Sequence, residues 1–454
     1  MKKLPCILTI AGSDSGGGAG IQADLKAITV LGGYGLSVIT ALTAQNTRGV
    51  EGIHAPPAAF VAQQLKSVLT DIDVAAAKTG MLFSAAIMKA VAPFLRQASF
   101  PVVVDPVCVS QSGHKLLQDD AVNAMRELIF PHASLLTPNI PEAELFTGMS
   151  IKGPEDIARA AAKLLEMGPA TVLIKGGHGM DSVASTDWFA RPGHKPLPFM
   201  QPRVETNNNH GTGCTLSAAI ATYLGMGQEL PQAVREAQKY LNICLRDEIS
   251  VGQGSGPPNH LAPQLKERER WPVLRELAEV AQALTDVEGL GRLLPRCGAN
   301  VAYALPYPAG PADVASLSAP LCREAGGRIL LVGHPAFEAD PVLTSVLLSA
   351  RKVRPDLHCC FSLRYEPGIL EALATGGVGV ASFDRKAAPA TASRSWEAAL
   401  EWGVFHAFSS HATAADVAIV ADAGDQGVEG GTYLFASTAA ELLSLLKKTL
   451  KMLK

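Results

Sequence analysis

The 454-residue chain has few charged and few aromatic residues, at 18% and 6%. Its 48% of hydrophobic residues excludes a disordered chain, which would be rich in charge and poor in hydrophobic residues. Lys and Arg together number 39 against 42 Asp and Glu, so the net charge is only −3. Without an excess of positive charge to attract nucleic-acid phosphates, we expect no nucleic-acid partner.

Cysteine is also sparse, with eight residues that form no CxxC pair and no short paired framework. We therefore expect reduced thiols and a cytoplasmic protein. No apolar run approaches the ~20 residues that span a bilayer, so we expect no membrane partner. The apolar letters of Leu4–Ala11 lead into a glycine loop rather than a small-residue cleavage site, which favours a buried strand over a secretion signal.

Short β-branched apolar runs alternate with helical periodicity over the first 262 residues. This alternation predicts an α/β domain with a mainly parallel sheet covered by helices on both faces. The expected strands are Cys6–Ala11, Gly35–Thr40, Pro101–Asp105, Ser134–Thr137 and Thr171–Lys175. The expected helices are Gly20–Leu31, Ala58–Thr70, Gly153–Met167 and Thr215–Leu224.

The breaker-rich stretch Gly252–Asn259 and the charge run Lys266–Arg270 interrupt this pattern. They predict a first domain over residues 1–262, a linker over 263–273 and a second, smaller α/β domain over 274–454. An amphipathic helix from about Val273 to Leu284 should open the second domain. Its expected strands are Ala299–Leu305, Arg328–Val332, Cys359–Leu363, Val378–Ser382 and Val417–Ala421, and its other expected helices are Pro341–Ala350 and Ala439–Leu453.

The segment His210–Ala219 (HGTGCTLSAA) combines a glycine loop with the start of an apolar helix. Glycines at 211 and 213 let backbone amides turn inward, and a helix N-terminus after such a loop attracts phosphate. Cys214 falls in the first helical turn, where the helix dipole is expected to lower the pKa of its thiol. An ordinary strand–helix turn with a small buried cysteine fits the same letters, so both interpretations stay open.

The segment Gly12–Gly20 (GSDSGGGAG) is a second glycine loop between a strand and a helix. It resembles a dinucleotide-binding loop, but its glycines lack the GxGxxG spacing and no acidic residue follows at the required distance of ~20 residues. A Rossmann dehydrogenase is therefore only a weak alternative. The chain also has no GxxxxGK[ST] motif, which excludes a Walker-type phosphate site.

Polar residues follow three of the expected strands, namely Asp105, Asn139 with Glu142, and Lys175. Open α/β sheets bind ligands at the carboxyl ends of their strands, so these side chains should gather at one edge. Two carboxylates, an amide and a lysine beside a phosphate-binding helix suit phosphoryl transfer with magnesium. Each residue alone is better explained as a helix cap or a solvated strand end, and only their recurrence at strand ends favours a site.

Several separated motifs within residues 4–262 resemble the hydroxymethylpyrimidine/phosphomethylpyrimidine kinases. The motifs are Thr9–Asp24 (TIAGSDSGGGAGIQAD), Thr40–Asn46, Lys78–Met81 (KTGM), Val104–Val107, Thr137–Asn139, Lys175–Gly177 and His210–Cys214 (HGTGC). The resemblance implies a ribokinase-like parallel-sheet sandwich and a role in thiamine biosynthesis. The implied reaction is ATP- and Mg²⁺-dependent phosphorylation of 4-amino-5-hydroxymethyl-2-methylpyrimidine to its mono- and diphosphate. A pyridoxal-type kinase of the same fold and a nucleotide-binding non-enzyme are the alternatives, and the family suggests a homodimer.

The resemblance also implies a role for individual residues. Cys214 would be the base that faces the hydroxymethyl group, at a position where ribokinase-like enzymes usually carry aspartate. The implied anion hole and ATP contacts are Gly211, Thr212, Gly213, Asn139 and Lys175, and the implied magnesium ligands, through water, are Asp105 and Glu142. The implied pyrimidine contacts are Gly12, Asp24, Gln45, Met81 and Val107. Gln111 stands where the family often has lysine, which removes one cation near the phosphates.

The second domain resembles ThiN-type thiamine-phosphate synthases. The similar segments are Gly298–Pro306, Ser362–Tyr365, Ser382–Arg385, Trp402–Gly403 and Asp416–Val417. Such a domain joins the pyrimidine diphosphate to thiazole phosphate with loss of pyrophosphate. The implied ligand site is Asn300, Arg364, Asp384 and Arg385, whose guanidinium groups could bind a diphosphate in a bidentate manner.

Two departures from the ThiN pattern weaken the case for synthesis. The family's Ser-Ser-His segment is Glu338–Pro341 here, and its Asp-Arg-Gly segment reads Asp-Ala-Gly over Asp422–Gly424. These changes remove anion ligands, and Glu338 and Asp340 would repel a diphosphate. A non-catalytic ligand-binding module therefore remains the alternative, as does a purely surface ion-pair role for the two arginines.

Overall fold

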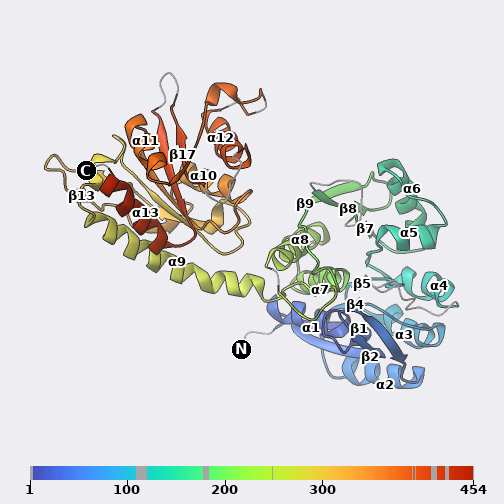
Figure 1. The fold of residues 1–454 in the computed structure, drawn as a ribbon. Helices are drawn as coiled ribbons and strands as arrows, with labels where there is room; N and C mark the ends of the chain where they lie inside the picture. The colour runs from blue at the N-terminus through green and yellow to red at the C-terminus, as the bar shows by residue number, and fades with distance from the viewer. Residues whose placement is uncertain are drawn as a thin grey trace. The chain divides into compact units, whose positions relative to one another are not determined.

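The computed structural model describes residues 4–108, 120–176, 184–247, 249–390, 392–393, 395–410, 417–424 and 429–452. The chain divides into two compact units, residues 1–264 and 265–454 (Figure 1). Each unit has its own sheet and its own hydrophobic clusters.

A nine-stranded sheet of order β3-β2-β1-β4-β5-β6-β7-β8-β9 forms the centre of unit 1. Its strands are β1 (Cys6–Asp14), β2 (Tyr34–Asn46), β3 (Gly49–His54), β4 (Val74–Thr79), β5 (Val102–Val104), β6 (Leu135–Leu136), β7 (Val172–Ile174), β8 (Ala184–Ala190) and β9 (Leu197–Pro202). All pairs from β2 across to β7 are parallel, whereas β3, β8 and β9 join through antiparallel pairs. The expected mainly parallel sheet is confirmed.

Helices cover both faces of this sheet because successive strand residues alternate between two buried clusters. Ile7 packs with α1 (Gly20–Val30), α7 (Thr212–Gly225) and α8 (Leu230–Arg246) on one face. Leu8 belongs to the cluster on the other face. The helices of that face are α2 (Ala58–Leu69), α3 (Ala85–Gln97), α4 (Ala121–Ala124), α5 (Ile140–Thr147) and α6 (Pro154–Leu165), with the short segments η1 (Met125–Ile129) and η2 (Phe130–His132). Burial on both faces explains the continuous apolar strands.

Unit 2 is built on a seven-stranded sheet of order β14-β11-β10-β15-β18-β17-β16. Its strands are β10 (Val301–Ala304), β11 (Val314–Leu317), β14 (Pro335–Phe337), β15 (Cys359–Arg364), β16 (Gly379–Phe383), β17 (Val417–Asp422) and β18 (Gly431–Ala436). The pairs are antiparallel except β16 with β17. The expected strand over 328–332 is not part of this sheet, since β13 (Ile329–Leu330) pairs only with β12 (Cys322–Arg323).

The helices of unit 2 also pack on both faces of its sheet, in two clusters. They are α9 (Ala262–Thr285), α10 (Pro341–Arg351), α11 (Pro367–Thr375), α12 (Trp396–Ser410) and α13 (Ala439–Met452), with the short segments η3 (Leu290–Arg292), η4 (Pro311–Asp313) and η5 (Arg385–Ala387). Residues 263–273, where we expected a linker, are helical and form the first half of α9. This helix therefore starts at Ala262 and not near Val273.

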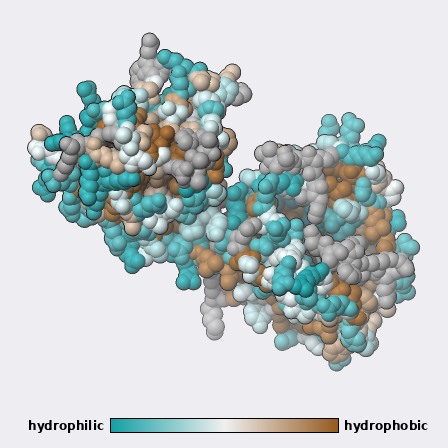
Figure 2. Space-filling model, viewed as in Figure 1, coloured by the Kyte–Doolittle hydropathy of each residue, from teal (hydrophilic) through white to brown (hydrophobic). Residues whose placement is uncertain are grey.

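Hydrophilic and hydrophobic side chains are interspersed over the visible face of each unit (Figure 2). Among the described residues, no helix combines the length and the apolar character that crossing a membrane requires.

Candidate active site

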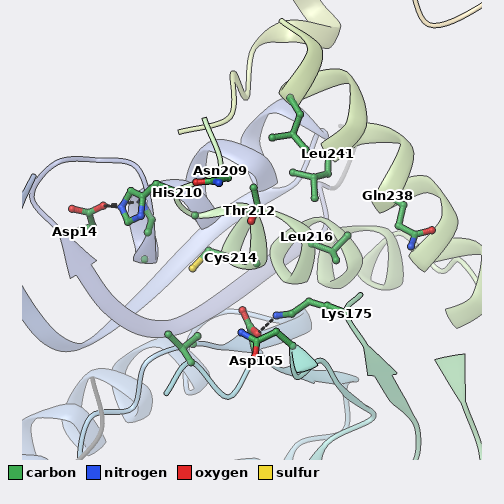
Figure 3. A pocket seen from close by; sticks show the side chains of 18 of the residues that line it. Asp14, Asp105, Lys175, Asn209, His210, Thr212, Cys214, Leu216, Gln238 and Leu241 are labelled. Atoms are coloured by element: carbon green, nitrogen blue, oxygen red, sulfur yellow. Dashed lines mark hydrogen bonds and ion pairs between the residues drawn. The ribbon is translucent and has the colours of Figure 1, made fainter. Parts of the chain in front are cut away.

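A cavity of about 740 Å³ lies at the carboxyl ends of the parallel strands of unit 1. This volume falls within the usual range for small-molecule sites. Of the described site residues expected in unit 1, only Asp24 is absent from the wall of this cavity. The expected residues that line the cavity are Gly12, Gln45, Met81, Asp105, Val107, Asn139, Glu142, Lys175, Gly211, Thr212, Gly213 and Cys214. In Figure 3, Asp14 and His210 lie on one side of Cys214, and Leu216, Gln238 and Leu241 lie on the other. Gln111 and Gly177 lie outside the described residues.

The two glycine loops meet in the wall of this cavity. Gly211 caps α7 with a left-handed φ of 82°, and a Cβ atom there would lie 2.0 Å from the carbonyl oxygen of Gly18. A Cβ atom at Gly20, which has a φ of 57°, would lie 2.3 Å from the carbonyl oxygen of Gly12. Only glycine fits either position. The close approach leaves the first amides of α7 at the cavity wall, where helix N-termini bind anions.

Cys214 lies in the first turn of α7 and faces the cavity, as Figure 3 shows. The expected lowering of its pKa is wrong. Burial of the thiol raises its pKa to about 11, and the nearby carboxylates of Asp24 and Asp105 add to this effect. The opposing influences are the Lys78 ammonium and a hydrogen bond from the Gly20 amide, and they do not outweigh the lost hydration.

Asp105 and Lys175 form an ion pair inside the cavity, with 2.6 Å between Nζ and Oδ1 (Figure 3). Asp105 follows β5 and Lys175 follows β7, the two strands on either side of β6. Burial opposes the charge on Lys175, but Asp105 and Glu142 overcome it and raise the pKa of Lys175. The lysine is therefore a fixed cation in the neutral pH range.

Glu142 and Asn139 form a capping box at the start of α5. Asn139 Oδ1 accepts from the Glu142 amide at 2.8 Å, and Glu142 Oε2 accepts from the Asn139 amide at 2.9 Å. Burial raises the pKa of the Glu142 carboxyl. Both residues thus have the structural role of a helix cap while they also line the cavity. Together with Asp105, Glu142 offers the carboxylate oxygens that Mg²⁺ prefers, so these side chains fit that ion.

Asp24 does not reach the cavity wall, in contrast to our expectation. Its carboxylate is fully buried and lies 2.9 Å, through each oxygen, from the Nζ atom of Lys78. Thr9 Oγ1 donates a further hydrogen bond of 2.6 Å to Asp24 Oδ2. A carboxylate with these partners has no free face for a pyrimidine ring, so Asp24 acts on its surroundings through Lys78.

A polar network that the sequence analysis missed joins the two glycine loops. Asp14 accepts hydrogen bonds from the amides of Gly16, Gly18 and Ala19. The Nε2 atom of His210 lies 3.0 Å from Asp14 Oδ2 and 3.0 Å from Gln45 Nε2. Burial would raise the pKa of Asp14, but the hydrogen bonds from His210 and the loop amides lower it. The sequence signal was the position of both residues beside glycines.

A second missed pair lies at the far side of the cavity. Asp187 on β8 accepts from Gln238 Nε2 at 2.7 Å and from the Gly176 amide at 3.0 Å. Burial raises the pKa of the Asp187 carboxyl. No sequence pattern pointed to this pair, because β8 itself was not predicted.

In unit 2, three of the four expected ligand residues (Arg364, Asp384 and Arg385) lie at the same end of the strands of the sheet. Arg364 and Asp422 both lie opposite Gly431, and Asp384 and Arg385 directly follow β16, whose last residue pairs with Asp422. Arg385 is buried and donates from Nε to Asp422 Oδ2 at 2.8 Å and from Nη2 to the same oxygen, whereas its Nη1 has no partner among the described residues. Arg364 pairs with Glu366, and its buried Nε atom has no partner within the same part of the chain.

Asn300, the fourth expected ligand residue, is already fully hydrogen-bonded. Its Oδ1 accepts from two backbone amides, and its Nδ2 donates to Leu317 O and to Asp340 Oδ2 at 2.9 Å each. The expected contact of Asn300 with a ligand is therefore not supported. Asp340 in turn caps α10 through the Leu343 amide. Its charge is offset by the helix N-terminus, so it repels an anion less than we expected.

A glycine loop at a helix N-terminus, two carboxylates, and a lysine at the carboxyl ends of a parallel sheet define the class of small-molecule kinases with a ribokinase-like fold. Within that class, the chain belongs to the phosphomethylpyrimidine kinase family, whose model matches residues 14–259. A second family model, "Thiamine-phosphate synthase ThiN", matches residues 276–448.

Relatives agree with this assignment. The chain is 49% identical over 270 residues to the thiamine biosynthesis bifunctional protein ThiED of Geobacter sulfurreducens, covering 58% of this chain and 54% of that protein. It thus spans about half the length of that relative. It is 43% identical over 265 residues to the hydroxymethylpyrimidine/phosphomethylpyrimidine kinase of Haemophilus influenzae, covering 58% of this chain and 98% of the kinase.

Solved structures of pyridoxal kinases share the fold of unit 1. The ADP complex of the Bacillus subtilis enzyme gives a TM-score of 0.53 at 31% identity, covering 58% of this chain and 100% of that one. The Staphylococcus aureus enzyme in complex with AMP-PCP and pyridoxal also gives 0.53 at 31% identity, covering 58% of this chain and 96% of that one. These similarities confirm the expected ribokinase-like fold.

Proposed function

We propose that unit 1 is an ATP-dependent kinase of thiamine biosynthesis that phosphorylates 4-amino-5-hydroxymethyl-2-methylpyrimidine and then its monophosphate. The observation that carries this proposal is that one cavity is lined both by a cysteine at the glycine turn of α7 and by the residues expected to contact the pyrimidine. Cys214 lies beside the amides of α7, and Gln45 and Met81 line the same wall. The named activities of the relatives support the same reaction.

The cavity residues would have separate roles in phosphoryl transfer. The α7 amides and Lys175 would hold the phosphates and balance the negative charge that develops on them. Asp105 and Glu142 would hold Mg²⁺, which neutralises and orients the triphosphate when bound. Cys214, in its thiolate form, would accept the proton of the acceptor hydroxyl and become the thiol. The oxygen then forms a bond to the γ-phosphorus as the bond to the leaving ADP breaks.

A pyridoxal-type kinase is the second candidate, because the similar solved structures are pyridoxal kinases. The side chains expected to contact the acceptor favour the aminopyrimidine over pyridoxal. Gln45 offers both a donor and an acceptor, which match an amino group beside a ring nitrogen. Such hydrogen-bonding sites reject analogues that lack the matching groups.

The test is ADP release by the whole chain with Mg²⁺, measured with the aminopyrimidine alcohol and with pyridoxal at equal concentrations. We expect turnover of the aminopyrimidine at a kcat/KM at least tenfold above that of pyridoxal. The Gln45→Ala variant should lose most of this preference. A higher kcat/KM for pyridoxal would contradict the assignment.

For unit 2 we propose coupling of the pyrimidine diphosphate to thiazole phosphate. The proposal is supported by two guanidinium groups at one end of the strands of unit 2, each with a donor that no described residue accepts from, so that a diphosphate could accept from both. Because Asp340 caps α10, the helix N-terminus offsets its charge, and it repels a diphosphate less than its charge alone would. The alternative is a module that binds a phosphorylated intermediate without chemistry.

Incubation of the whole chain with ATP, the pyrimidine alcohol and thiazole phosphate separates these two functions. Formation of thiamine phosphate, and its loss in Arg364→Met but not in the solvent-exposed Arg159→Met, would support the synthase. Accumulation of the pyrimidine diphosphate with unit 2 folded would favour the binding module.

A further inference from the structure

Lys78 is a buried charge in the cavity wall that no expected role explains. It lies in β4, and its side chain has no solvent-exposed surface, yet it lines the cavity. Its Nζ atom is held by both carboxylate oxygens of Asp24, and Thr9 fixes that carboxylate from the other side. Lys78 therefore lines the cavity, and Asp24 lies farther from the cavity, behind Lys78.

The ammonium group of Lys78 has one donor to spare. Lysine carries three N–H donors, and Asp24 accounts for two of them. Within the described part of the chain, no other group accepts from Nζ. A buried donor without a partner is costly, so an acceptor from a bound molecule would satisfy it.

Gly80, which lines the same cavity, has no side chain that could separate the Lys78 ammonium from a bound molecule. A Cβ atom at Gly80 would lie 3.0 Å from Nζ, so any larger residue there would press against the charged group. Cys214 and Asp105 are the other titratable groups whose charge acts on Lys78. Lys78 and Cys214 also line the same cavity, so the spare donor and the thiol that we place opposite the acceptor hydroxyl border the same space.

We infer that Lys78 is a substrate-binding residue of the kinase whose spare N–H binds the acceptor oxygen, with Asp24 and Thr9 as its positioning residues. The inference rests on the proposed kinase function of unit 1. In this role Lys78 donates a hydrogen bond and transfers no proton. A fixed ammonium beside the attacking oxygen stabilises the negative charge that develops there as the proton leaves.

The test needs a variant that does not leave one buried charge alone. Removing only one partner of a buried ion pair is strongly destabilising, whereas replacing both by neutral groups of similar size is tolerated far better. The Asp24→Asn/Lys78→Met double variant does this. We expect kcat to fall by about 10²-fold or more, as when one fixed donor to a developing oxyanion is removed. We also expect KM for the aminopyrimidine to rise while KM for ATP stays within about twofold.

A matched control is Asp313→Asn/Lys266→Met, which removes a lysine–aspartate pair in unit 2 and should leave both kinase constants unchanged. Thermal unfolding of each variant verifies that the protein compared is folded. If the wild-type chain itself does not phosphorylate the aminopyrimidine, the proposed function fails. If the wild type turns over and the folded Asp24→Asn/Lys78→Met variant keeps its kcat and its KM for the aminopyrimidine, the inference about Lys78 is wrong. Equal changes of both KM values would also overturn it, since they indicate a structural role.

Discussion

At the scale of single residues, Cys214 is the group on which the proposed chemistry depends. Replacing it with alanine should lower kcat by about 10²–10⁴-fold, because a general base contributes that much. Nucleotide binding should change little, since the phosphate site that we propose consists of the α7 amides and Lys175. Steady-state kinetics and a nucleotide titration of the Cys214→Ala variant check both parts. A near-normal kcat would reduce Cys214 to a core residue.

The raised pKa of the Cys214 thiol makes a second prediction, on pH dependence. The thiol is protonated in the neutral range because its pKa is about 11, and only the thiolate can accept a proton. We expect kcat to rise with pH over about pH 6 to 10, as long as the group titrates with a high pKa. The Cys214→Asp variant should shift this rise to lower pH, since the carboxyl group of aspartate has a lower pKa than a thiol. An unchanged profile in that variant would show that another group controls it.

The polar cavity residues that follow the strands could be predicted from the sequence because they lie in short motifs at strand ends. Asp105, Asn139, Glu142 and Lys175 meet for this reason, since parallel strands end at one edge. The role of Asp24 could not be predicted. Its partner Lys78 lies 54 residues away, and only the fold reveals that the pair is buried. The internal bonding of Asn300 in unit 2 was hidden for the same reason.

At the scale of elements, apolar β-branched strands were predictable and the others were not. β4 reads VAAAKT, and alanine-rich letters favour a helix, while its lysine is buried only because of an ion pair. The first half of α9 looked like a linker because of its charges. Within this half, Glu267 pairs with Arg270 at helical spacing, and Arg275 pairs with Glu279 in the second half; such pairs stabilise a helix.

The segment before α9 provides a prediction on stability. His260 is buried, its Nε2 lies 2.9 Å from Thr215 Oγ1 of α7, and burial lowers its pKa from 6.5 to about 4. The folded state therefore binds fewer protons than the unfolded state between these pH values. Its stabilising contribution is complete above pH 6.5 and is lost as the pH falls towards about 4.

His260→Gln keeps a polar partner for Thr215 but removes the titration. The free energy of unfolding of this variant, measured by denaturant titration at several pH values, should fall less steeply between about pH 6.5 and 4 than that of the wild type. Parallel curves for the two proteins would contradict the buried neutral state of His260.

At the scale of the whole molecule, each unit has its own hydrophobic core. The clusters around Ile7 and Leu8 belong to unit 1, and those around Val301 and Ala302 belong to unit 2. We therefore expect a shortened chain that ends at residue 264 to fold and to keep the kinase kcat within about threefold, because folding units with separate cores are stable alone. Circular dichroism and the ADP-release assay test this, and aggregation of the shortened chain would show that its core is incomplete.

The contact between Gly211 and the carbonyl oxygen of Gly18 also has a consequence for how the enzyme can evolve. Main chain approaches main chain there, so we expect the spacing between the proposed acceptor site and the proposed phosphate site to be independent of side-chain size. Substitutions at neighbouring positions should then alter substrate preference and leave that spacing unchanged. We expect such a fold to accept a new acceptor molecule while it retains the same transfer geometry.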